Sequence, residues 1–450
     1  MSLFLEFNTN SNFSKEKTYI IDVFCKDFLS IDYNINFDDS LKNFVIENEN
    51  LKVVLPDIFF ENFYKNKIEK APITENFETG LFDDNLAQLP AWFFTSKENN
   101  SLPVDILGMA FFVMTGYSDL LFSKKDKHSR DIGTTSFLNI NGLIDRPVIQ
   151  EWFTVLAMKL FNITSLEEFN IRLEYRKHIS HDVDQPFEYL NYTFQRLVKR
   201  VAGDLILRKQ PSIAKQRIKL YLKVKRGEYH LDPFNNFDKL LGILKHKKIN
   251  STFFFVTGSN HPNHDVLYDI EHSAIKEIIR KVGTANHTIG IHPSYNTLNH
   301  SSLLKKEVDK LRTVCREIGV NQNISSCRKH YLRWDWKSTP NSLFLAGIKH
   351  DYTLGYADRS GFRAGVAFAF HAFDWETKSK LGLLLHPLIV MECSLLDINY
   401  MNLSFAEAEG KIIHYHNQLT KLGGEFVLLW HNHRLLNPEE LELFKKSISL

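Results

Sequence analysis

Two aspartates separated by one residue, Asp182 and Asp184 in the stretch SHDVDQP, are the first candidates for chemistry in this chain. Side chains two positions apart on a strand point to the same face, about 6–7 Å apart along the chain. Two carboxylates at that spacing raise each other's pKa unless a cation or an arginine lies between them. The pair is therefore either a polar turn or part of a site that also contains positive charge.

Other polar residues stand near the ends of strand-like segments in the same part of the chain. His292 and Asn296 come in TIGIHPSYN, Arg328 in SSCRKHYLRW, and His431 at the end of FVLLWHNH. In parallel α/β barrels the chemistry gathers at the carboxyl ends of the strands. We expect these side chains to lie together with the aspartate pair.

The elements that would position these residues are short strands alternating with amphipathic helices. The clearest helix is SLLKKEVDKLRTVCREIG, in which apolar residues recur at 4-3-4-3 spacing opposite a polar face. Such alternation implies a parallel sheet covered by helices, closed or nearly closed. The strand-like runs are residues 251–258, 288–295, 349–356, 383–391 and 425–433.

The sequence texture changes near residue 170. Up to about residue 165, short apolar runs mix with polar turns and helical segments, and no catalytic spacing occurs. One of these segments, PVIQEWFTVLAMKLF, has Pro147 where a first helical turn tolerates it. We expect a smaller α+β domain over residues 1–165 and a catalytic domain over residues 170–450.

Composition narrows the class of protein. The chain has 450 residues, 44% hydrophobic and 24% charged, which is typical of a globular protein. Lys and Arg number 55 against 53 Asp and Glu, so no overall basic excess indicates a nucleic-acid partner. The four cysteines lack CxxC spacing, which favours a reducing compartment and argues against a thiolate metal site. With neither a signal-peptide pattern nor a long apolar span, the sequence predicts a cytoplasmic location.

The motifs together resemble the polysaccharide deacetylases with a NodB homology domain, carbohydrate esterase family 4. SHDVD resembles the first motif of that family, NHTIGIHPSYN the second, RKHY the third and LLWHN the fifth. The motif sequences are most similar to those of a bacterial subgroup that has an N-terminal domain of unknown function. The resemblance covers roughly residues 170–450 and implies a distorted (β/α) barrel of the NodB type.

The resemblance also implies roles for individual residues. Asp182 would be the catalytic base, Arg328 the arginine that orients it, and His431 the general acid. Asp358, in GYADRSGFRAG, would fill the blurred fourth motif. The residues that would contact the substrate are Tyr331, Leu429, Tyr295 and Trp334. Tyr331 would do so through its backbone N–H.

For the metal, the resemblance implies Asp184 and His292 as ligands, with Asn296 where the family has a second histidine. An amide oxygen is a weaker ligand than imidazole, so a zinc ion would be held weakly. The third motif also departs from the family pattern, because a histidine follows Arg328 and Lys329 where proline is usual.

Two assignments have rivals in the sequence. Arg333 competes with Arg328, and His433, two residues on, competes with His431. The spacing of the motifs favours Arg328 and His431.

The resulting prediction is a metal-dependent hydrolase that removes an acetyl group, most simply an N-acetyl group, from a sugar or glycan intermediate. The alternative is a catalytically silent carbohydrate-binding or scaffold protein on the same barrel. The sequence sets neither the glycan nor the oligomeric state.

Overall fold

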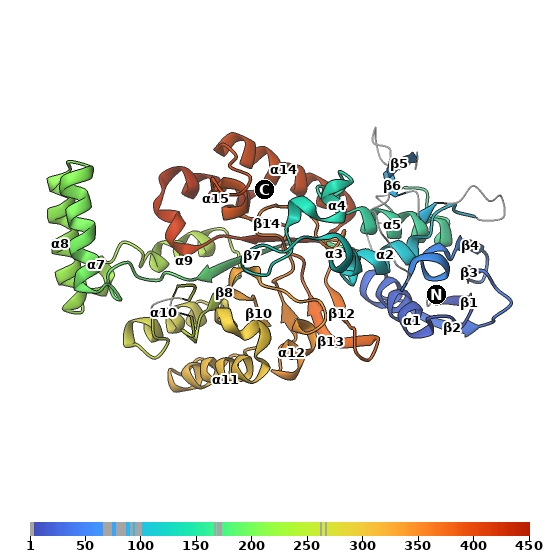
Figure 1. Cartoon of the computed structure of the whole chain (residues 1–450), viewed down its shortest axis with the longest axis horizontal. Coiled ribbons are helices and arrows are strands. Elements are labelled where there is room, and N and C mark those ends of the chain that lie inside the picture. The colour runs from blue at the N-terminus through green and yellow to red at the C-terminus, as the bar shows by residue number, and fades with distance from the viewer. Residues whose placement is uncertain are drawn as a thin grey trace. The chain divides into compact units, whose positions relative to one another are not determined.

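The chain is a mixed α/β protein whose computed structural model divides into two compact units (Figure 1). The first unit contains residues 1–178 and 331–428, and the second contains residues 179–330 and 429–450. None of the helices among the described residues combines the length and hydropathy needed to cross a bilayer. The structure describes residues 4–65, 74–77, 87–90, 93–94, 101–165, 168, 173–261, 263–265 and 268–450.

The second unit is built on four parallel strands in the order β10-β9-β8-β7. Phe253, Phe254 and Phe255 of β8 (Ser251–Phe255) are fully buried, as expected for a parallel strand covered on both faces. The strands are β7 (Tyr175–Val183), which begins in the first unit, β8 (Ser251–Phe255), β9 (Thr288–Ile291) and β10 (Ser326–Cys327).

Helices connect these strands, which confirms the predicted alternation. In α11, the helix expected from the 4-3-4-3 spacing, Leu304, Val308 and Leu311 are fully buried. The long helices of the connections and of the C-terminus are α9 (Phe237–His246), α10 (Ser273–Thr284), α11 (Ser301–Glu317) and α15 (Pro438–Ser449). The short helical turns are η6 (Tyr229–Leu231), η7 (Tyr295–Asn299) and η9 (Asn432–Leu436).

A helical hairpin is inserted between β7 and β8. It consists of α7 (Phe194–Ala202), a π-helical turn η5 (Gly203–Leu207) and α8 (Pro211–Lys225). Within the second unit, α7 and α8 stand clear of α9 and β8 (Figure 1). This hairpin was not expected from the sequence.

The N-terminal part of the first unit contains a four-stranded sheet in the order β2-β1-β3-β4. Its strands are β1 (Phe4–Thr9), β2 (Asp32–Phe37), β3 (Asn43–Glu47) and β4 (Lys52–Pro56), and a further pair is β5 (Thr74–Phe77) and β6 (Ala87–Pro90). The helices are α1 (Ser14–Asp22), η1 (Val23–Phe28), η2 (Phe59–Phe63), α2 (Ile106–Met114), α3 (Tyr117–Phe122), η4 (Gly133–Thr135), α4 (Phe137–Ile140) and α5 (Val148–Phe161). The last of these begins directly after Pro147, as the sequence predicts.

The C-terminal part of the first unit contains strands that do not all run parallel. β11 pairs in parallel with β13, but β12 pairs with β13 in the antiparallel sense. This antiparallel pair departs from the parallel sheet expected from the sequence. Closure of the strands into a barrel is still a prediction. The elements are η8 (His330–Leu332), which begins in the second unit, α12 (Thr339–Leu345), β11 (His350–Asp351), β12 (Phe370–Asp374), β13 (Ser379–Leu385), β14 (Val390–Met391), α13 (Glu392–Leu396), α14 (Phe405–Leu422) and β15 (Gly424–Leu429).

Residues from the two parts of the first unit share buried hydrogen bonds. The Gln150 side chain donates to the carbonyls of Leu422 and Gly423, and its oxygen accepts from the N–H of Ala367. Buried Arg363 pairs with Asp119 and Asp131 at 3.0 and 2.7 Å. Helices of residues 1–165 therefore share hydrogen bonds and ion pairs with residues after 331. That residues 1–165 fold as an independent domain is still a prediction.

Candidate active site

Strand register brings the candidate residues of the second unit together. Val183, Phe255, Ile291 and Cys327 are aligned across β7, β8, β9 and β10. The residues that follow three of these strands, Asp184, His292 and Arg328, are all candidates from the sequence analysis. Their meeting at one edge is thus a consequence of the parallel register.

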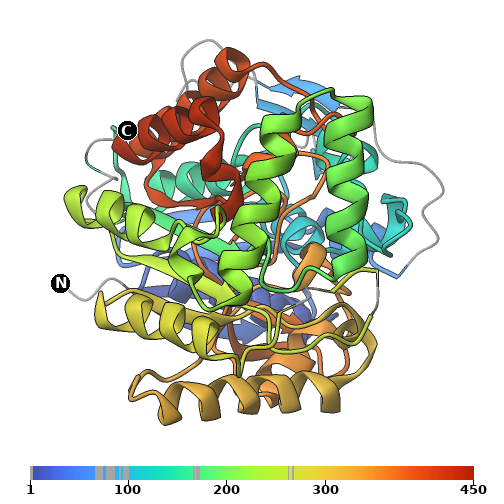
Figure 2. The same ribbon diagram turned by 90° about the vertical axis from the view of Figure 1, so that its left-hand side faces the viewer.

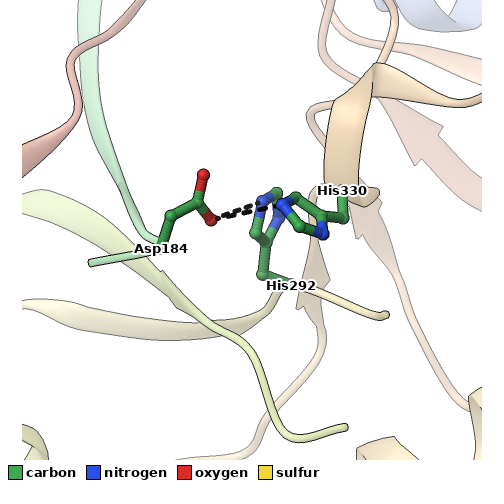
Figure 3. Close-up of side chains that lie close together, drawn as sticks. All are labelled: Asp184, His292 and His330. Carbon is green, nitrogen blue, oxygen red and sulfur yellow. Dashed lines mark ion pairs between the residues drawn. The ribbon is translucent and has the colours of Figure 1, made fainter. Parts of the chain in front are cut away.

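Asp184, His292 and His330 form a cluster suited to a metal ion (Figure 3). Oδ1 of Asp184 lies 3.3 Å from Nε2 of His292 and 3.7 Å from Nε2 of His330. One ligand atom from each of the three residues lies within 4.8 Å of the other two. Oδ1 of Asp184 is buried and faces the two imidazole nitrogens, an arrangement suited to a cation shared by the three side chains.

The outer nitrogen of each ring faces an acceptor. Nδ1 of His292 lies 2.5 Å from the carbonyl of Arg328, and Nδ1 of His330 lies 3.5 Å from Oδ1 of Asp265. Metal-bound histidines commonly donate this second N–H to a carbonyl or a carboxylate, which directs the other nitrogen toward the ion. The donor set and its surroundings therefore fit a divalent metal.

Asp265 in turn is fixed by the backbone. Its carboxylate accepts N–H bonds from Asn260, His261 and Tyr295, each at 2.7 Å. These bonds join the loop after β8 to the loop after β9 and hold the acceptor that faces His330.

The electrostatics of the cluster also favour a bound cation. Burial alone lowers the pKa of His330, but the carboxylates of Asp184 and Asp265 outweigh this effect and raise that pKa to about 9. Burial disfavours the charged form of Asp184, yet the two neighbouring histidines hold its pKa well below the usual value. A proton on His330 and a metal ion would thus compete for the same negative surroundings.

Asp182 lies beside this cluster and is paired with Arg328. The Arg328 guanidinium donates from Nη1 to Oδ1 of Asp182 at 3.1 Å and to Oγ of Ser180 at 2.8 Å. The other carboxylate oxygen of Asp182 lies 3.7 Å from Nε2 of His292. The predicted pairing of Asp182 with Arg328 is therefore present, and the other carboxylate oxygen of Asp182 lies toward His292 of the cluster.

The position of Arg328 depends on an aromatic ring and a glycine. Its guanidinium lies over the ring of Phe254, 4.7 Å from the centroid. A Cβ on Gly290 of β9 would lie 2.5 Å from that ring. Glycine at residue 290 therefore allows β9 to pass close to the ring that supports Arg328.

His431 faces the same cluster from the segment after β15. Its Nε2 lies 3.6 Å from Oδ2 of Asp184. His433, its rival in the sequence, packs its ring against Phe234 at 5.7 Å. Asn432, between them, donates to the carbonyls of Gln185 and Phe234 and fixes the segment.

Three further predicted residues lie in the second unit outside the cluster. The amide of Asn296 donates to the carbonyl of Asn260 at 2.8 Å. The Tyr295 ring packs on His264, and Leu429 is fully buried at the end of β15. His330 is the third member of the cluster, and the predicted role of Asn296 as a metal ligand stays a prediction.

The remaining predicted residues belong to the first unit. The carboxylate of Asp358 accepts the backbone N–H groups of Gly133 and Thr134. Trp334 is buried against Trp336, and Tyr331 has a positive φ of 62°. Arg333, the rival of Arg328, donates to the carbonyl of His128 at 2.8 Å.

His330 is the site residue that the sequence analysis missed. The signal was present, because His330 stands where the third motif usually has proline. In the resemblance stated above, residue 330 has a histidine in place of the usual proline, and residue 296 has an asparagine in place of the usual histidine.

One family model matches the N-terminal part of the chain. Residues 5–165 match a family of unknown function, DUF7033. No curated protein sequence matches the chain.

Several solved structures resemble about three fifths of the chain. A protein described as a polysaccharide deacetylase, from Mycobacterium smegmatis, is 17% identical, with 62% of this chain and 83% of that chain covered and a TM-score of 0.39. Puue allantoinase is 12% identical, with 62% and 84% covered and a TM-score of 0.37. The chitin deacetylase of Colletotrichum lindemuthianum is 15% identical, with 61% and 81% covered and a TM-score of 0.27. At these TM-scores the similarities do not establish what this chain does.

Proposed function

We propose that the chain is a metal-dependent hydrolase that removes an acetyl group, in the first instance an N-acetyl group, from a sugar or glycan intermediate. One observation carries the proposal: Asp182, paired with Arg328 through one oxygen, directs the other toward His292 of a three-residue metal-binding cluster. A base beside a metal site is the arrangement that amide or ester hydrolysis by an activated water requires.

Asp184, His292 and His330 would hold the metal, and zinc is the ion that fits them best. Three protein ligands of the imidazole and carboxylate type, with a position left for water or substrate, are typical of catalytic zinc sites. When bound, the ion would polarise the acetyl carbonyl and lower the pKa of a water molecule. In this proposal His330 would supply an imidazole as third ligand, where the resemblance implied the weaker amide oxygen of Asn296.

Asp182 would accept the proton of the attacking water. The guanidinium of Arg328, 3.1 Å from Oδ1 of Asp182, holds that carboxylate in place by an ion pair. Since both side chains are buried, the base is held in one orientation. General-base assistance of this kind contributes about 10²–10⁴-fold to the rate.

His431 would protonate the departing amine. Its distance of 3.6 Å from Asp184 places the imidazole at the edge of the cluster, where the leaving group would emerge. Leu429 would border the pocket for the acetyl methyl group, and Tyr295 would contact the sugar. The roles of Tyr331, Trp334 and Asp358 remain proposals by resemblance alone.

The test is acetate release by the purified full chain, supplied with zinc, from N-acetylglucosamine oligomers and from O-acetylated sugars. We expect turnover that a chelator removes and zinc restores. Binding of these glycans without acetate release would contradict the proposed hydrolase activity and favour the alternative of a catalytically silent carbohydrate-binding protein.

A further inference from the structure

The helical hairpin formed by α7, η5 and α8 carries a charge very different from that of the rest of the chain. Residues 194–226 contain eleven Lys or Arg and one acidic residue, Asp204. The whole chain has 55 basic and 53 acidic residues, so the remaining residues hold 44 and 52. A nearly neutral chain therefore concentrates its positive charge on one projecting element of the second unit.

The one acidic residue of the hairpin pairs with two of its arginines and leaves the exposed lysines unchanged in charge. The carboxylate of Asp204 is buried and pairs with Arg208 at 2.6 Å and with Arg217 at 2.7 Å. Arg217 also pairs with Glu188 at 3.0 Å, which links the hairpin to the segment after β7. These ion pairs fix the two helices together, while Lys209, Lys215 and Lys219 are exposed.

Apolar side chains are exposed between these basic residues. Leu205, Ile206 and Leu207 follow one another at the tip, and the last two are 72% and 82% exposed. Single exposed apolar residues are ordinary, but the hairpin holds eight of the 18 large exposed apolar side chains found among the described residues. The eight are Phe194, Val198, Leu205, Ile206, Leu207, Ile213, Ile218 and Leu222.

The two helices are also the elements of the second unit nearest the viewer in Figure 2. From that side α7 and α8 lie in front of the other helices and strands of their unit. Their outer face and the tip are therefore open to a large, flat partner.

We propose that this hairpin binds the surface of a bilayer that contains anionic lipids. Apolar residues at the tip would enter the boundary between headgroups and acyl chains, and the flanking lysines and arginines would contact the lipid phosphates and carboxylates. The inference stands on the hairpin alone and does not depend on the proposed hydrolase activity.

Charge and apolar surface together distinguish this occupant from two others. A second copy of the hairpin would bring two strongly basic surfaces together, which repulsion opposes. A nucleic acid would use the lysines and arginines but would leave the exposed side chains of Ile206 and Leu207 without apolar contacts, since single strands bind mainly by stacking on aromatic rings. An anionic bilayer satisfies both kinds of side chain.

The experiment is co-sedimentation of the full chain with vesicles of phosphatidylcholine alone and with about 30% phosphatidylserine. We expect the chain to bind the anionic vesicles and to bind the neutral ones at least about tenfold more weakly. Most binding should be lost in 0.5 M salt, because the screening length then falls to about 4 Å. Replacing Ile206 and Leu207 by Ser, or Lys209, Lys215 and Lys219 by Gln, should each weaken binding by about tenfold or more.

The matched control is Ile398→Ser, which removes a side chain that is 80% exposed in the first unit. This variant should bind as the parent does, and all variants should keep the thermal transition of the parent because the changed residues are exposed. The proposal is overturned if anionic vesicles do not bind the parent, or if the hairpin variants bind them equally well. It is also overturned if the parent dimerises through this surface or binds single-stranded RNA in preference to vesicles.

Discussion

Nε2 of His330 lies 3.7 Å from Oδ1 of Asp184, although sequence motifs place the third metal ligand on a different loop. Asn296, the residue expected there, directs its amide to the carbonyl of Asn260. The two loops follow neighbouring strands, β9 and β10, so a ligand can move from one to the other while facing the same carboxylate. Because His330 faces Asp184, we expect the affinity for zinc to depend on His330 more than on Asn296.

We expect His330→Ala to weaken zinc binding by at least about 100-fold, because it removes one of three ligands. Asn296→Ala should change the affinity by less than about threefold, and Asn296→His should not tighten it, since the third place is taken. Calorimetric titration of zinc into the metal-free parent and the three variants at one pH measures these differences. Equal affinities for the parent and His330→Ala would remove His330 from the site.

Zinc affinity should rise with pH. In the metal-free chain the pKa of His330 is raised to about 9, above its value near 6.5 in an unfolded chain. The protonated form therefore stabilises the metal-free fold fully below about pH 6.5, and that stabilisation is lost as the pH rises through about 9. Because the metal must displace this proton, we expect about a tenfold gain in affinity per pH unit between pH 7 and 8.

Competition with a chelating dye across that pH range measures the slope. His330→Ala, which has no proton to lose at this residue, should show a clearly smaller slope and serves as the control. A parent whose affinity does not change between pH 7 and 8 would show that His330 is neutral before the metal binds.

Asp182→Asn should reduce kcat for acetate release by about 10²–10⁴-fold while the zinc affinity stays within about threefold of the parent. The amide keeps the shape of the side chain but cannot accept the proton of a water molecule. Some stability should also be lost, because Arg328 is buried and would keep its charge beside a neutral partner. Asp309→Asn, at an exposed residue of α11, is the matched control and should keep the activity and stability of the parent.

Much of the site followed from the sequence because register is a regular property. Asp184, His292 and Arg328 each come directly after a strand, and aligned parallel strands bring such residues to one edge. The helix over residues 301–317 is equally predictable from the sequence, since its apolar spacing repeats over several turns.

The parts that could not be predicted lie where the backbone is irregular. β10 has only two residues, and the chain then turns through positive φ angles of 62° and 54° at Tyr331 and Leu332. Periodicity says nothing about where His330 or Arg333 point in such a turn. The antiparallel pairing of β12 with β13 depends on contacts between distant residues, which no local pattern encodes.

Gln150 offers a test of whether residues 1–165 fold independently. Its side chain makes three buried hydrogen bonds to the backbone of residues 367, 422 and 423. Gln150→Leu would leave those backbone groups without these partners, and we expect it to lower the free energy of unfolding by about 2–4 kcal/mol. Gln216→Leu, at an exposed residue of α8, should change it by less than about 0.5 kcal/mol.

Urea unfolding followed by tryptophan fluorescence and circular dichroism measures both glutamine variants. If residues 1–165 form a separate folding unit, the parent will show two transitions and only one of them will move in Gln150→Leu. If they fold together with residues after 331, the transition that reports the N-terminal helices will coincide with that of the C-terminal strands, and the domain boundary predicted near residue 165 will be wrong.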